Sequence, residues 1–160
     1  MAWLKRLIKI CSILVGALIL GGTYLIWVLS ESQFSLKSVD VVIRQQRIRA
    51  EVVSSPAALY RGLSGRAELC PDCGLLFNFS GSAEREFVMR DMRFPLDIIF
   101  INGGQIINIA ANLEPEGNNP QHIYRSASPA NQVLEVNGGS AERWGFKIGD
   151  RILTQEIKEK

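Results

Sequence analysis

The stretch Leu96-Asp97-Ile98-Ile99-Phe100-Ile101-Asn102-Gly103-Gly104-Gln105-Ile106-Ile107-Asn108-Ile109 decides the fold. Two runs rich in β-branched residues flank Asn102-Gly103-Gly104, and Asn-Gly tolerates the positive φ angles that tight hairpin turns require. The spacing therefore predicts an antiparallel hairpin with strands over Leu96–Ile101 and Gln105–Ile109. Because the first strand is apolar at almost every position, we expect it to be buried.

Further strand signals lie on both sides of this hairpin. Charged and apolar residues alternate over Arg47–Val52, which is the period-2 pattern of a strand with one wet face. Other strands are expected at 39–43, 74–79, 85–90, 133–136 and the end of 146–153, and the strand at 85–90 is expected to pair antiparallel with 74–79. Short helices are expected after Ser55 and Ser140. Residues 113–129 are expected to form a surface loop. The pattern is typical of a mainly β protein, a small antiparallel β-sandwich or barrel-like domain with short helices.

Residues Ile10–Leu29 form a run of 20 residues without a charged side chain. As a helix rising ~1.5 Å per residue, the run spans ~30 Å, the thickness of the hydrocarbon core of a bilayer. Lys5, Arg6 and Lys9 precede the run, and positively charged flanks stay on the cytoplasmic side. We therefore expect one N-terminal transmembrane helix that contacts the lipid bilayer and places the remainder of the chain outside the cytoplasm.

This topology divides the chain into five parts. Residues 1–9 are the cytoplasmic N-terminus, 10–29 the transmembrane signal-anchor, 30–38 a linker, 39–155 an extracytoplasmic β-rich domain and 156–160 a charged tail. The expected location is the cell membrane, with a single pass. The alternative is secretion after cleavage of a signal peptide near Ser30-Glu31-Ser32, although the apolar run is longer than the ~7–15 residues usual in such peptides.

The charge of the exported part is close to neutral. Lys5, Arg6 and Lys9 account for three of the 18 basic residues, which leaves 15 against 16 acidic residues. A basic surface is the electrostatic footprint of a nucleic-acid-binding protein, so the balance argues against a nucleic-acid partner.

Several blocks of this sequence resemble one known family. They are Arg61-Gly62-Leu63-Ser64-Gly65-Arg66, Gly74-Leu75-Leu76-Phe77-Asn78-Phe79, Phe87-Val88-Met89-Arg90-Asp91-Met92, Pro95-Leu96-Asp97-Ile98-Ile99-Phe100-Ile101, and 133–139 continuing to Gly149-Asp150-Arg151. The blocks occur in order over nearly all of residues 40–153 and are similar to those of the "domain of unknown function 192" family, an uncharacterised protein family. The resemblance implies a compact β-sandwich-like fold, often exported, and it implies no established activity, so it assigns no catalytic residue. No cofactor is predicted. The chain departs from the family pattern at Val88, Arg90, Asp91 and Met92.

Cys70-Pro71-Asp72-Cys73 is the most specific local motif in the chain. A disulfide that closes a tight loop in an oxidising compartment is the leading interpretation. A catalytic redox pair is the second, although such pairs usually lie at a helix N-terminus and this motif precedes a strand. A zinc site is the third, but it needs four ligands and only Cys11 and His122 remain as further candidates, so no metal site is predicted.

Asp97 lies at the entrance of the buried strand, where an unpaired carboxylate would be costly. One hypothesis is a structural ion pair with a nearby arginine. The other is a shallow polar pocket of Arg66, Arg90, Asp91 and Asp97 that holds an anionic or sugar-like ligand. These four residues are the predicted binding site.

The leading functional hypothesis is a non-enzymatic, membrane-anchored envelope module that binds an unknown ligand or protein through loops on a β-rich scaffold. The alternative is an enzyme, either a thiol–disulfide protein that uses Cys70 and Cys73 or a hydrolase that uses Asp97. A purely structural envelope protein is a third hypothesis.

Overall fold

The hairpin predicted from residues 96–109 lies within the main sheet of the domain. The structure is a computed structural model, and it describes residues 37–157. Strands β5 (Leu96–Asn102) and β6 (Gln105–Leu113) pair antiparallel, and Gly103 and Gly104 connect them with φ angles of 55° and 75°. All β5 residues from Leu96 to Ile101 are buried, as expected from their composition.

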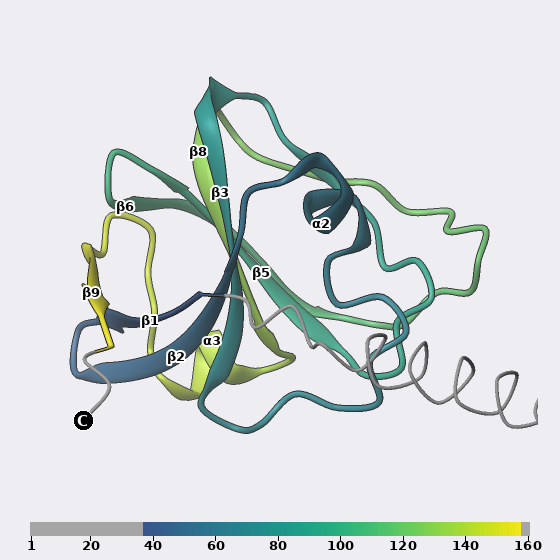
Figure 1. The fold of residues 1–160 in the computed structure, drawn as a ribbon, viewed down its shortest axis with the longest axis horizontal. Coiled ribbons are helices and arrows are strands. Elements are labelled where there is room, and N and C mark those ends of the chain that lie inside the picture. Colours follow the sequence, from purple (N-terminus) through teal and green to yellow (C-terminus); the bar gives the residue numbers. More distant parts are fainter. Residues whose placement is uncertain (1–36, 158–160) are drawn as a thin grey trace, which may run out of the picture. The chain divides into compact units, whose positions relative to one another are not determined.

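Seven strands form the main sheet, in the order β6-β5-β8-β3-β2-β1-β9 (Figure 1). The remaining five strands are β1 (Ser38–Ile43), β2 (Gln46–Val53), β3 (Cys73–Ala83), β8 (Ala130–Asn137) and β9 (Ile152–Glu156). The prediction of a mainly β domain with short helices is confirmed, but the sheet is mixed, not purely antiparallel, because β2 and β3 run parallel. The residues between β2 and β3 lead the chain back to the end of the sheet at which β2 begins, as a parallel connection requires.

The two edges of the sheet meet, which makes the domain barrel-like. Gln105 at the start of β6 forms an isolated bridge with Arg151, next to β9. The backbone N–H of Ile106 donates to the carbonyl of Asp150 (3.0 Å), and the N–H of Ile152 donates to the carbonyl of Gly104 (2.9 Å). These bonds satisfy backbone groups that an open sheet edge would leave exposed.

The segment expected to pair with residues 74–79 takes another partner. Only Glu86–Phe87 (β4) is a strand, and it pairs with Tyr124–Arg125 (β7) in a separate two-stranded sheet. The prediction is wrong because β3 already has β2 on one side and β8 on the other. β7 also interrupts the long loop predicted over 113–129.

Two short helices complete the domain. Helix α2 (Pro56–Arg61) begins as expected, with Ser55 as its N-cap, and Oγ of Ser55 accepts a hydrogen bond from the N–H of Ala58 (3.4 Å). Helix α3 (Ser140–Arg143) begins one residue earlier than predicted, and Gly139, with no capping side chain of its own, is the N-cap. The carboxylate of Asp97 takes the place of a capping side chain and accepts hydrogen bonds from the N–H groups of Gly139 and Ala141.

Buried side chains form two clusters on opposite faces of the sheet. The inner cluster takes residues from every strand of the main sheet and from α3, including Ile48, Ile99 and Leu134. The outer cluster lies against β3, β5 and β8 and includes Phe77 of β3. Other members, among them Leu63, come from the segments that follow α2 and β4. Since side chains alternate between the faces of a strand, the outer cluster contains Val133 and the inner one Leu134.

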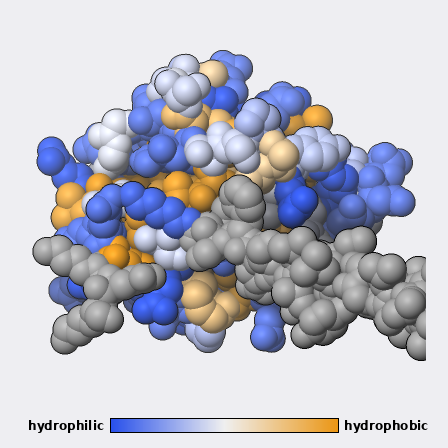
Figure 2. Space-filling model, in the orientation of Figure 1, coloured by the Kyte–Doolittle hydropathy of each residue, from blue (hydrophilic) through white to orange (hydrophobic). Residues whose placement is uncertain are grey.

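The surface of residues 37–157 is mixed in character. On the face drawn in Figure 2, hydrophobic patches are interspersed among hydrophilic side chains. The large exposed hydrophobic side chains are Tyr60, Ile123, Ile148 and Leu153, which come from four separate segments. No helix within residues 37–157 has the length and apolar character needed to cross a membrane, and the expected transmembrane segment 10–29 lies outside the described residues.

Candidate functional site

Glu135, in the middle of β8, is a carboxyl group buried among apolar side chains. Its relative exposure is 5%, and its Oε2 has no hydrogen-bond partner within the described chain. Burial raises its pKa from 4.5 to about 8, and the positive charge of Arg66 opposes this only in part. The group is therefore mostly protonated at neutral pH. An unsatisfied buried carboxyl lowers stability, and a bound ligand is one explanation for its presence.

A groove of about 540 Å³ opens above Glu135 on the outer face of the sheet. We call it the Glu135 groove. Helix α2 and the segments that follow α2, β3 and β4 build its walls, and its lining includes Tyr60, Arg61, Leu63, Phe77, Phe87, Arg90 and Glu135. Its volume is within the range of small-molecule sites, and a few polar groups among apolar and aromatic walls are typical of such sites.

The glycine at the end of α2 brings the backbone close to the floor of the groove. Gly62 has a φ of 53°, which a residue with a side chain rarely adopts. A Cβ at this position would lie 3.3 Å from the ring of Phe77 and 3.7 Å from Oε2 of Glu135. The backbone of Gly62 thus approaches the carboxyl closely without covering it with a side chain.

Two arginines of the groove rest on aromatic rings. The guanidinium of Arg85 lies 3.8 Å from the ring centre of Phe79, and that of Arg90 lies 4.3 Å from the ring centre of Tyr60. Arg90 also donates to the carbonyl of Tyr60 (3.4 Å), and Arg85 donates to backbone carbonyls. Cation–π contacts position these guanidiniums without neutralising them.

Arg66 is held by a carboxylate beside the groove. Its two terminal nitrogens donate to the two carboxylate oxygens of Glu51, at 2.9 and 2.5 Å. This pairing lowers the pKa of Glu51 and raises that of Arg66, and Glu135 adds a smaller electrostatic contribution to Arg66. Arg66 therefore lies close enough to influence Glu135, although its donors are engaged by Glu51.

Asp97 lies apart from the other predicted binding residues. It is fully buried, and its carboxylate accepts hydrogen bonds from the backbone N–H groups of Asn112 (2.6 Å), Gly139 (2.9 Å) and Ala141 (2.7 Å). The sequence suggested an arginine as the partner of Asp97, but its partners are backbone amides. The carboxylate caps α3 and fixes the end of β6, so its oxygens are engaged and screened from solvent.

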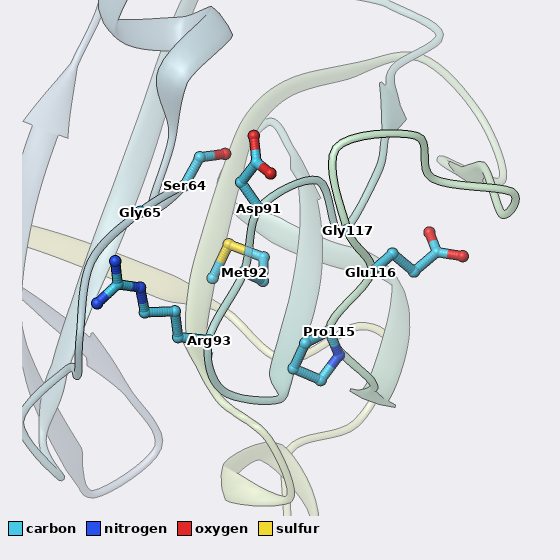
Figure 3. Close-up of a pocket in the computed structure, with 8 residues that line it drawn as sticks. All are labelled: Ser64, Gly65, Asp91, Met92, Arg93, Pro115, Glu116 and Gly117. Carbon is cyan, nitrogen blue, oxygen red and sulfur yellow. The ribbon is translucent and has the colours of Figure 1, made fainter.

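Asp91 lines a second, more open hollow of about 660 Å³. Figure 3 shows Ser64 near Asp91, with the side chain of Glu116 extending away from both. Oγ of Ser64 donates to the carbonyl of Arg90 (2.8 Å), and Glu116 accepts from His122 (2.7 Å), a pairing that lowers the pKa of Glu116. Because Ser64 and Glu116 are already paired and Asp91 is exposed, this hollow is a weaker candidate than the Glu135 groove.

The predicted binding residues thus divide into three places. Arg90 lines the Glu135 groove and Arg66 lies beside it, Asp91 lines the neighbouring hollow, and Asp97 caps α3. Sequence reasoning missed Glu135. The available signal is a single acidic residue within the apolar run Val133–Val136, where a strand buried on both faces has no solvent-exposed position for a charge.

Cys70 and Cys73 form a close pair on either side of a turn, and Cys73 is the first residue of β3. Their Cα atoms lie 5.1 Å apart, which suits a disulfide. Because a strand begins at Cys73, the pair is not at the start of a helix, where a thiolate would be stabilised. Over residues 37–157, no group of three or more His, Cys, Asp and Glu side chains is placed to hold a metal ion.

The fold and the groove define a small barrel-like β domain with a site of ligand size on one outer face. The chain belongs to the family named domain of unknown function 192, described as an uncharacterized ACR, whose model matches residues 39–154. No curated protein matches the chain.

Two solved structures share this fold over 77% of the chain. A Sinorhizobium meliloti protein described as a candidate transcription regulator is 29% identical, with a TM-score of 0.72, and 98% of it is covered. A protein of unknown function from Novosphingobium aromaticivorans is 33% identical, with a TM-score of 0.70, and 89% of it is covered.

Proposed function

We propose that this protein is a membrane-anchored binding module whose extracytoplasmic β domain holds a small ligand, or part of a partner, in the Glu135 groove. The observation that carries the proposal is the buried carboxyl of Glu135, whose Oε2 has no hydrogen-bond partner within the described residues and which lines a groove of ligand size. A ligand that hydrogen-bonds this oxygen would offset the cost of burying it.

Binding is favoured over catalysis by the state of the other reactive groups. The oxygens of Asp97 are engaged by three backbone amides, so a hydrolase that uses Asp97 has no free carboxylate. The Cys70–Cys73 pair lacks the helix N-terminus that activates the thiol of many redox proteins. The near balance of acidic and basic residues after residue 9 gives no support to a nucleic-acid partner.

We expect the Glu135→Met variant to lose ligand binding. Methionine keeps the volume of the side chain and removes its hydrogen-bonding oxygens, so compounds held by the floor of the groove should bind about tenfold or more weakly. The measurement is saturation-transfer NMR of the full chain in mild detergent against a chemically varied library of small compounds.

The matched control is Glu114→Met, the same change at an exposed residue outside the groove. It should bind every compound that the parent binds. The proposal is overturned if no compound binds the parent, or if Glu135→Met binds all of them as well as the parent does.

Residues 10–29 are proposed to anchor the chain, with the domain on the outer side of the membrane. The uncharged run of 20 residues and the basic residues before it support this topology. The Cys70–Cys73 pair is then proposed to be a disulfide, which persists in an oxidising compartment.

A protease added to intact cells should degrade the C-terminal domain and leave a cytosolic marker protein uncut. In the denatured chain, a maleimide reagent should label one of the three cysteines before reduction and all three afterwards, because only Cys11 lies outside the pair. A protected domain, or three reactive thiols without reductant, would count against export.

A further inference from the structure

The charged side chains that face the Glu135 groove are not balanced. Three arginines line it, namely Arg61, Arg85 and Arg90, against the carboxylates of Glu84 and Glu86. Glu86 is itself bound by Arg125 (2.8 Å). Over residues 37–157, no ion pair involves Arg61 or Arg90, so the rim of the groove carries excess positive charge.

The floor of the groove offers a hydrogen-bond donor at neutral pH. With its pKa near 8, Glu135 is mostly protonated, and a carboxylic acid donates one O–H while it keeps an acceptor oxygen. Arg66, the cation beside it, is engaged by Glu51 and leaves Oε2 unpartnered. The floor therefore presents O–H to a ligand oxygen instead of a negative charge to a cation.

The walls between floor and rim are apolar. Leu63, Phe77 and Phe87 line the groove, and the ring of Phe87 packs edge-on against Phe77 with centroids 5.0 Å apart. A hydrocarbon or aromatic body would remove this surface from water, which favours binding in proportion to the area buried.

Resting on the binding function proposed above, we infer that the ligand of the Glu135 groove is an organic anion with an apolar body. Its carboxylate or similar group would bind Arg61 and Arg90, and the protonated Glu135 would donate to one of its oxygens. A cationic ligand would instead meet three guanidiniums against two carboxylates, and a floor that carries no charge.

Three probes that share one body test this inference: 3-phenylpropionate, 3-phenylpropylamine and 3-phenylpropanol. Each is titrated into the full chain in mild detergent at pH 7 and pH 9, where the acid and the amine keep their charges. We expect the carboxylate to bind most tightly at pH 7 and about tenfold more weakly at pH 9, because ionised Glu135 loses its donor and repels the anion. The other charged groups that line the groove are Arg61, Glu84, Arg85, Glu86 and Arg90, and Arg66 beside it lowers the pKa of Glu135 in part.

Two variants assign the effect to named groups. Glu135→Gln keeps an N–H donor and cannot ionise, so it should bind 3-phenylpropionate equally at both pH values. Arg90→Gln should weaken that probe about tenfold or more, whereas Arg47→Gln, at an arginine paired with Asp40 on β1 and β2, should not.

The outcomes distinguish a failure of the anionic ligand class from a failure of the proposed binding function. Tighter binding of the amine, or affinity for the carboxylate that rises from pH 7 to pH 9, overturns the anionic class and leaves a binding groove. If no probe binds while library compounds still bind in a Glu135-dependent way, the anionic class is again overturned. If neither probes nor library compounds bind, the proposed function itself fails.

Discussion

The Asp97→Ala variant should be the most strongly destabilised single substitution considered for this domain, by about 4 kcal/mol. It leaves three backbone N–H groups without an acceptor: that of Ala141, whose hydrogen bond is buried, and those of Asn112 and Gly139, whose hydrogen bonds are half-buried. Each unsatisfied donor costs about 1–3 kcal/mol, and some will be rescued by water or by relaxation. The measurement is urea unfolding of the full chain in mild detergent, followed by tryptophan fluorescence.

Asp97→Asn provides a finer test of the same role. Its amide oxygen can still accept, but its NH₂ group must face at least one backbone donor, so we expect a loss of about 2–3 kcal/mol. Asp72→Asn, at an exposed aspartate, should change stability by less than about 0.5 kcal/mol. An Asp97→Asn protein of parental stability that loses ligand binding would show instead that Asp97 serves a site.

The β5–β6 hairpin can be predicted from the sequence because its signals are local. The turn glycines, the β-branched runs and the apolar character of β5 all lie within 14 consecutive residues. Helix α2 is likewise predictable from Ser55 and Pro56 at its start. The parallel pairing of β2 with β3 and the partner of β4 depend on which strands occupy each edge, and no short motif encodes this.

The candidate site is harder to predict because its parts are distant in the sequence. Glu135 interrupts the apolar run of β8, but its place in a groove depends on the pairing of β3 and β5 with the two edges of β8, and on α2 and the segment around Phe87, which form the walls. Asp97 is noticed readily because it interrupts an apolar run. Its role could not be predicted, since the amides that bind it belong to Asn112, Gly139 and Ala141, far along the chain.

Glu135→Met should remove most of the pH dependence of stability between pH 5.5 and 9. In the unfolded chain the carboxyl titrates near 4.5, whereas in the folded domain its pKa is about 8. Between these values the folded state binds more protons, so the free energy of unfolding of the parent falls as pH rises, by up to about 1.4 kcal/mol per unit. This decrease in the free energy of unfolding is complete above about pH 8. We expect the stability of Glu135→Met relative to the parent to increase by about 3 kcal/mol across this range, measured by urea unfolding at each pH.

The other acidic groups whose pKa is shifted should contribute little within this window, which makes the variant diagnostic. The pKa values of Glu51, Glu116, Asp150 and Glu156 are lowered by their partners, so their effects lie below pH 4.5, and the raised pKa of Tyr124 acts above pH 10. Glu114→Met should keep the parental slope. If Glu135→Met keeps that slope as well, Glu135 is ionised throughout and has a partner. The protonated donor at the floor of the groove, and with it the preference for an anion, would then be lost. If the slope disappears in Glu135→Met, the parent chain carries a carboxyl at position 135 that lowers its stability as pH rises. Such a cost is expected for a residue kept for binding.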